Sequence, residues 1–220
     1  MKFFERLPFL LLLLAAVGCR EIHTEKFEGV HRAAKTLETS IALGVTNPKL
    51  RELVQGLSAE ISIVRDKVNT ERERALVEEY EQASAVYLDS LQLWDIQNEQ
   101  NAKFTQSQAE WHEKWDAIDM SVGIPVVYIH RDPDSIYVCK SDRCSADEII
   151  VARIVRKYNL PISTHTYRGN SWDSISATSS LHNLWKVGDD KLQSCNVHLN
   201  ASRQKFAVFE TKSDSTAGAN

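Results

Sequence analysis

Three cysteines and one histidine are the residues of this sequence whose types and spacing best suit chemistry. Cys139 and Cys144 are separated by four residues, and Cys195 is separated from His198 by two. Three thiolates and an imidazole can hold zinc tetrahedrally, and the first spacing is allowed in such sites. The two pairs lie far apart along the chain, so only folding could bring them together.

Two further segments begin like catalytic motifs but lack a required residue. His112 starts a pattern typical of a zinc-protease helix, but Asp116 stands where the second histidine would be needed. Ser171 lies in a segment that begins like a nucleophile turn, but Asp173 replaces its final glycine. An amphipathic helix and a loop serine explain these residues better. We therefore predict no catalytic residue.

The N-terminus has the three zones of an export signal. Lys2 and Arg6 are basic, residues 7–17 are apolar, and small residues lead to Cys19. Because a membrane-spanning helix needs roughly 20 apolar residues, this shorter run predicts a signal peptide.

The segment Ala16-Val17-Gly18-Cys19 resembles the lipobox of bacterial membrane lipoproteins, with Ala16 in place of the commonest leucine. The resemblance implies a signal peptide over residues 1–18, acylation of Cys19 with palmitate-type chains, and a short linker through residue 23. Two or three acyl chains anchor stably, since each buried CH₂ contributes about 0.8 kcal/mol. The alternative is an ordinary secretory signal with an unmodified Cys19.

Export also bears on location and on the remaining cysteines. Residue 20 is arginine and not the aspartate that is associated with retention at the inner membrane. In a bacterium with two membranes we therefore expect the protein at the outer membrane, facing the periplasm.

In an oxidising compartment nearby thiols tend to pair. A disulfide among Cys139, Cys144 and Cys195 therefore needs fewer coincidences than a metal site that includes His198. Inert thiols are the third reading, and the connectivity stays open.

Helical periodicity dominates residues 24–120. Thr24 and Gly44 fit the ends of a first helix, and Asn47-Pro48 fits the start of a second. The apolar stripe of the second helix consists of Leu50, Leu53, Val54, Leu57, Ile61, Val64 and Val68. We therefore predict a helical hairpin or bundle.

Thr70 and Glu73 match a capping box that opens a third helix. Its stripe contains Leu76, Tyr80, Ala83, Tyr87, Leu91 and Trp94. We interpret these aromatic residues, with Trp111 and Trp115, as core and not as a ligand platform. The pattern leaves open whether residues 71–120 form one helix or two.

The region from the second helix through Trp94, with Asp66-Lys67 and the tyrosine–tryptophan stripe, resembles small exported bacterial helical-hairpin proteins of unassigned activity. The resemblance covers about a quarter of the chain. It carries over no functional residue.

Residues 121–211 are expected to form a smaller α+β segment. Val126–His130 and Ser135–Cys139 predict a short β-hairpin, and Ser145 and Glu148 form a second capping box that opens a helix to about Asn159. We expect loops over residues 163–180, helical spacing from Leu181 to Cys195, and a short strand at Phe206–Phe209. Residues 212–220 are predicted to be a disordered tail.

The sequence thus predicts a mainly α fold with a small α+β part, in a lipid-anchored cell-envelope protein with a structural or binding role. A net charge of −4 lacks the basic face that nucleic-acid binding requires. Expected partners are the membrane, through the lipid, and other envelope proteins, and no cofactor is expected. The alternatives are an exported hydrolase with a dispersed active site, or a metal-binding module built on Cys139, Cys144, Cys195 and His198.

Overall fold

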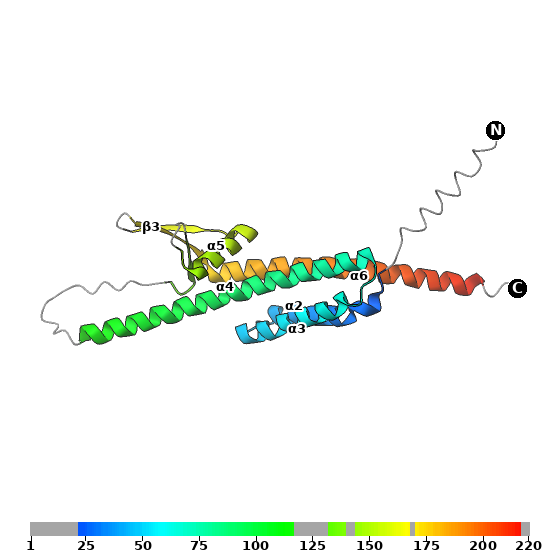
Figure 1. Cartoon of the computed structure of the whole chain (residues 1–220), viewed down its shortest axis with the longest axis horizontal. Coiled ribbons are helices and arrows are strands. Elements are labelled where there is room, and N and C mark those ends of the chain that lie inside the picture. The colour runs from blue at the N-terminus through cyan, green and yellow to red at the C-terminus, as the bar shows by residue number, and fades with distance from the viewer. Residues whose placement is uncertain (1–21, 117–131, 140–143, 168–169, 217–220) are drawn as a thin grey trace, which may run out of the picture. The chain divides into compact units, whose positions relative to one another are not determined.

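The computed structural model describes residues 22–116, 132–139, 144–167 and 170–216. The elements in chain order are η1 (Thr24–Phe27), α2 (Glu28–Ala42), α3 (Asn47–Arg65), α4 (Glu71–Asp116), β1 (Ser135–Val138), α5 (Ala146–Tyr158), β2 (Ser163–Tyr167), β3 (Asn170–Ser176) and α6 (Ala177–Thr216) (Figure 1). The chain is mainly helical, with one small antiparallel sheet in its C-terminal part. The predicted fold class is confirmed.

Local sequence signals set several of the helix ends. Glu73 donates its backbone N–H to Thr70 Oγ1 at 3.1 Å, and Thr70 returns its own N–H to the Glu73 carboxylate at 3.3 Å. Ser145 and Glu148 form the same reciprocal pair at the start of α5. Gly44, just after α2, has φ +90°, the conformation predicted for a glycine at a helix end.

The open question about the third helix is answered over residues 71–116. α4 is one helix of 46 residues. Its polar stretch, residues 95–103, contains no proline or glycine, so nothing there interrupts the hydrogen-bond ladder. Residues 117–120 lie outside the described part of the chain.

The described chain divides into two compact units. Unit 1 contains residues 22–44, 52–84 and 189–216, and unit 2 contains residues 45–51 and 85–188 where they are described. This division differs from the predicted boundary after residue 120. That boundary followed a change in composition, whereas α4 and α6 are long enough to contribute residues to both units.

Unit 1 is built from η1, α2, α3 and portions of α4 and α6. Its buried side chains include Phe27, Val30, Ala34, Leu37, Val54, Leu57, Ile61, Val64, Leu76, Val77, Tyr80, Ala83, Leu192, Cys195 and Leu199. The Phe27 and Tyr80 rings stack with centroids 6.4 Å apart. Hydrogen bonds join the helices, from Ser58 to Ser84 at 2.9 Å and from His31 to Asn196 at 2.8 Å.

Unit 2 contains the sheet, in the strand order β1–β3–β2, with both pairings antiparallel. Ile136 lies opposite Ile175, and His165 lies opposite Trp172. The two isoleucines are fully buried in a cluster with side chains of α4, α5 and α6. One face of the sheet therefore belongs to the core of this unit.

Three expectations about the C-terminal part need correction. The partner of strand 135–138 is β3, from a segment expected to be loops, while the expected partner strand at 126–130 lies outside the described residues. The many serines obscured the β-branched and aromatic residues that favour strands at Thr164, Thr166 and Trp172.

The expected strand at 206–209 is instead part of α6. A short apolar run cannot be assigned to strand or helix by its periodicity, and here the helix continues. Residues 212–216 of the expected tail are also helical. None of the helices in the described ranges combines the length and apolar character needed to cross a bilayer.

Candidate functional site

The cysteine cluster is divided in the structure. Cys139 and Cys144 are joined by a disulfide, with their Cα atoms 5.9 Å apart, directly before α5. Their sulfurs are therefore not thiolates available to zinc. Cys195 is a buried free thiol in unit 1. Over the described ranges, no three His, Cys, Asp or Glu side chains are arranged to hold a metal ion.

The environment of Cys195 suits packing and not nucleophilic chemistry. Burial, followed by the nearby Glu79 carboxylate, raises the pKa of the Cys195 thiol to about 12. At neutral pH the thiol is therefore protonated. A reactive cysteine needs the opposite surroundings, partly exposed and electropositive.

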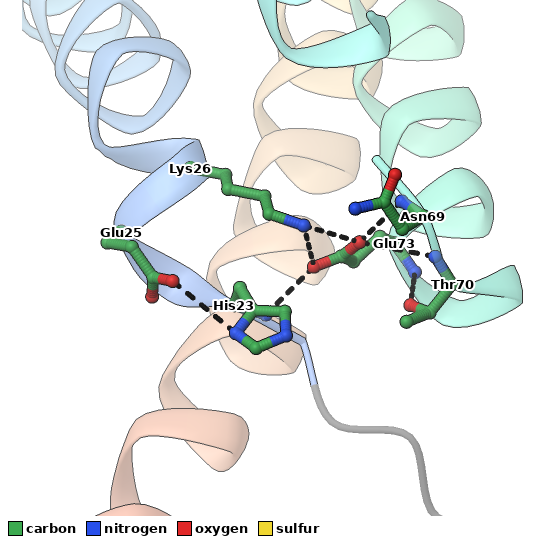
Figure 2. A network of polar contacts seen from close by, with 6 residues as sticks. All are labelled: His23, Glu25, Lys26, Asn69, Thr70 and Glu73. Carbon is green, nitrogen blue, oxygen red and sulfur yellow. Dashed lines mark hydrogen bonds and ion pairs between the residues drawn. The ribbon is translucent and has the colours of Figure 1, made fainter. Parts of the chain in front are cut away.

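A buried carboxylate at the start of α4 organises the first described residues of the chain (Figure 2). Glu73 is fully buried. It accepts hydrogen bonds from the backbone N–H of His23 at 3.0 Å and of Asn69 at 2.9 Å. Lys26 Nζ lies 3.0 and 3.1 Å from its two oxygens. Together with the bond from Thr70, these contacts replace the water that the carboxylate loses on burial.

The charge on Glu73 is strongly favoured. Burial alone would raise its pKa, but hydrogen bonds from Asn69, His23, Lys26 and Thr70 outweigh burial and lower the pKa to about 2. A carboxylate that accepts several backbone N–H bonds commonly behaves in this way. We call residues 22–27 together with Glu73 the latch. The contacts of Glu73 with His23 and Lys26 hold these N-terminal residues against α4.

The capping-box motif predicted one part of the hydrogen bonding of Glu73, its contact with Thr70. It indicated that Glu73 would reach back to Thr70, and that contact is present. It gave no sign that His23 and Lys26 would bind the same carboxylate, because these contacts span about fifty positions of sequence. A lone lysine in a polar segment has too many possible partners to be assigned from sequence.

A pocket of about 310 Å³ adjoins the latch within unit 1. Its walls come from the N-terminal segment, from one face of α4 and from α6. The lining residues are Ile22, Arg72, Ala75, Leu76, Glu79, His198, Ala201 and Ser202. Ile22 directly precedes His23, so the latch also fixes one wall of the pocket.

The polar groups of this pocket are arranged for binding. His198 Nδ1 and Glu79 Oε2 lie 2.9 Å apart, which holds the imidazole in place. Ser202 donates its hydroxyl to the His198 carbonyl at 3.1 Å, which is a local helix contact and not a nucleophile–base pair. Arg72 adds an exposed positive charge, while Leu76 and the alanines supply apolar surface. The pocket therefore combines a positive charge, a carboxylate at Glu79, an imidazole and apolar surface.

A second pairing, which the sequence did not predict, lies on the sheet. His165 Nε2 and Ser174 Oγ are 2.7 Å apart, a distance suited to a base and a nucleophile. Ser174, however, is only 2% exposed, so a substrate cannot reach its hydroxyl while the sheet is intact. The pair therefore orients the imidazole and does not form a catalytic dyad.

The structure describes only some of the remaining residues that the sequence analysis singled out. Cys19 lies outside the described residues, as do the side chains of His112 and Asp116. Of the aromatic stripe, Tyr80 and Tyr87 are fully buried and Trp94 packs on Trp185, with ring centroids 5.8 Å apart. These residues belong to the core, as predicted.

Comparison with known proteins adds no identification. No family model, no curated protein and no solved structure matches this chain.

Proposed function

We propose that this protein is a lipid-anchored cell-envelope protein that binds a small ligand beside its own anchor. Acylated Cys19 tethers the chain, and in a bacterium with two membranes it does so at the outer membrane, on the periplasmic side. The role is binding, without catalysis by the protein itself.

The observation that carries this proposal is the position of Ile22. Ile22 lies three residues after Cys19, lines the pocket, and is 8% exposed. An extended chain covers at most about 3.6 Å per residue, so the pocket wall at Ile22 lies within roughly 11 Å of the acylated cysteine. The hydrogen bond from the His23 backbone N–H to Glu73 holds the chain at the very next residue, so the folded body begins directly after Ile22.

The lining of the pocket supports binding over catalysis. Its serine is engaged with a backbone carbonyl, and the nearby Cys195 thiol is buried and protonated at neutral pH. The Arg72 guanidinium, the Glu79 carboxylate and the apolar surface around them match a small amphipathic molecule that carries polar groups of its own. Such molecules are concentrated at membrane surfaces, where the anchor would hold the pocket.

Fatty-acid labelling in cells that express the full chain tests the proposal. Wild-type protein is expected to incorporate labelled palmitate and to fractionate with membranes. Cys19→Ser is expected to lose the label and to accumulate as the uncleaved precursor. Cys195→Ser is the matched control and keeps the label, because Cys195 is buried inside unit 1. A labelled Cys19→Ser protein, or an unlabelled wild type, would contradict the proposal.

A further inference from the structure

The pocket of unit 1 carries two opposite charges on one helix. Arg72 and Glu79 both line it, and they lie seven positions apart on α4. Seven residues make almost two turns, so the two side chains project from the same face of the helix, with Cα atoms about 10.5 Å apart. Ala75 and Leu76 lie between them and also line the pocket. The wall formed by α4 therefore presents a cation, an apolar surface and an anion in a row.

These two charges do not neutralise each other. Within the residues that the structure describes, Arg72 is exposed and forms no ion pair. Glu79 Oε2 lies 2.9 Å from His198 Nδ1, and the Cys195 thiol also bonds to this carboxylate. Neither a neutral imidazole nor a protonated thiol cancels the negative charge of Glu79. A carboxylate accepts roughly four hydrogen bonds, so a donor group of a ligand has room beside these two.

The charges restrict what the pocket can bind. A purely anionic molecule drawn to Arg72 would meet the like charge of Glu79, and a purely cationic molecule at Glu79 would meet Arg72. A molecule that carries both charges is attracted at both ends. The cavity of about 310 Å³ is near the lower end of the range for small-molecule pockets, so it suits a compact polar group with a short apolar part.

The donor and acceptor chemistry narrows the ligand further. The guanidinium group of Arg72 can bind a phosphate or a carboxylate through two parallel hydrogen bonds. Glu79 is an acceptor, and a primary ammonium group offers it three N–H donors, whereas a quaternary ammonium group offers none.

We propose that the ligand of this pocket is a zwitterionic amphiphile with a primary ammonium group and a phosphate or carboxylate group. The ammonium group binds Glu79, the anionic group binds Arg72, and the apolar part covers Leu76. This chemistry occurs in the headgroup of phosphatidylethanolamine and in free amino acids with an apolar side chain. The assignment deepens the proposed binding role and rests on it, but it does not require acylation of Cys19.

Calorimetric titration of the full-length protein tests the assignment, with protein-free detergent micelles as the blank. The two zwitterionic probes are dihexanoyl phosphatidylethanolamine and leucine. Dihexanoyl phosphatidylglycerol is the matched probe, because it has the same acyl chains but only the negative charge. We expect saturable binding of at least one zwitterion, with a Kd for phosphatidylglycerol weaker by roughly tenfold or more. Preference for phosphatidylethanolamine identifies a lipid headgroup as the source, and preference for leucine identifies a free amino acid.

Substitutions in the pocket assign the two charges. Arg72→Gln and Glu79→Gln should each weaken binding of the zwitterion by roughly tenfold. Glu79→Gln should at the same time strengthen binding of phosphatidylglycerol, because the repulsion of its anion is removed, and damage to the fold would not produce that gain. The matched controls are Arg74→Gln and Glu78→Gln, which remove the same charges from exposed positions of α4 outside the pocket lining and should leave Kd unchanged.

Thermal unfolding of each variant establishes that the fold is intact. An absence of saturable binding of both zwitterions by the wild type would overturn the assignment, and so would equal or tighter binding of phosphatidylglycerol. Binding of phosphatidylglycerol alone would contradict the ligand class but not the proposed binding role. Labelling of Cys19 reports on the anchor separately, so the failure of one proposal is distinguishable from the failure of the other.

Discussion

Glu73 illustrates how one buried carboxylate can organise the start of a protein. Its oxygens satisfy the first turn of α4, the backbone of His23 and the ammonium group of Lys26. A buried charge is tolerated only when it is paired and hydrogen-bonded, and each of these contacts contributes to that compensation. Removing the charge should therefore release the N-terminal segment as well as weaken the helix cap.

Acid titration tests this role. The pKa of Glu73 is lowered from 4.5 to about 2 in the folded protein, so its stabilisation is fully present above pH 4.5 and is lost as the pH falls towards 2. We expect Glu73→Gln to lower the free energy of unfolding at pH 7 by about 2–3 kcal/mol and to flatten its decline below pH 4.5. Urea unfolding followed by circular dichroism at several pH values measures both effects.

Glu71→Gln is the control for this titration, because Glu71 is exposed in the same helical turn. It should leave both the free energy and its pH profile nearly unchanged. If Glu73→Gln shows the wild-type profile between pH 4.5 and 2, the latch does not stabilise the fold.

The thiols give a second prediction at this scale. Cys195 is buried with a raised pKa, and Cys139 is bonded to Cys144. Alkylation of the native protein should therefore modify none of the three. Unfolding without reductant should expose Cys195 alone, and reduction should then release the other two. Reaction of Cys139 or Cys144 in the unreduced protein, detected by peptide mapping, would be incompatible with the disulfide.

At the scale of elements, α6 crosses α4 closely enough to require a glycine. A side chain at Gly188 would come within 2.5–2.9 Å of the buried Tyr87 ring. Gly→Ala inside a helix normally stabilises by up to about 1 kcal/mol. At this position we expect Gly188→Ala to destabilise by about 1–3 kcal/mol through overpacking. Thermal unfolding measures the sign of the change directly.

Gly56 in the middle of α3 provides the comparison, since nothing lies within 4 Å of the position that its side chain would take. Gly56→Ala should follow helix propensity and raise the melting temperature. Two substitutions of the same kind should thus have opposite signs. Equal stabilisation by both would mean that α6 does not approach Tyr87 this closely.

The elements also show which parts of this protein could be predicted from sequence. Capping boxes and apolar stripes are local signals, and they identified the start of α4 at Thr70 and the start of α5 at Ser145. The strand β3 was missed because its polar residues, such as Asp173 and Ser174, have cross-strand partners that only the fold reveals. A pairing between β1 and β3 joins segments with a whole helix between them, and no local pattern encodes that.

The candidate sites were less predictable than the fold for the same reason. Glu73 was identified as a capping residue, but its contacts with His23 and Lys26 are long-range. The pocket joins Ile22 to residues of α6 that are distant in sequence. The stacking of Trp172 on His165 could not be predicted, because His165 lies on a strand that the sequence did not indicate.

At the scale of the whole molecule, very few residues join the proposed lipid anchor to the folded body. Only Arg20 and Glu21 lie between Cys19 and Ile22, and the latch holds the chain directly after Ile22. Unit 1 therefore carries a pocket close to the proposed anchor. The proposed ligand binding takes its envelope context from the proposed acylation of Cys19.

Mass spectrometry of the N-terminal peptide of the mature protein, purified from membranes, tests this central claim most directly. We expect the mature chain to begin at Cys19 and to carry diacylglycerol on its sulfur, with or without a further acyl chain on its amino group. A mature chain that begins elsewhere, or that begins at an unmodified Cys19, would contradict it.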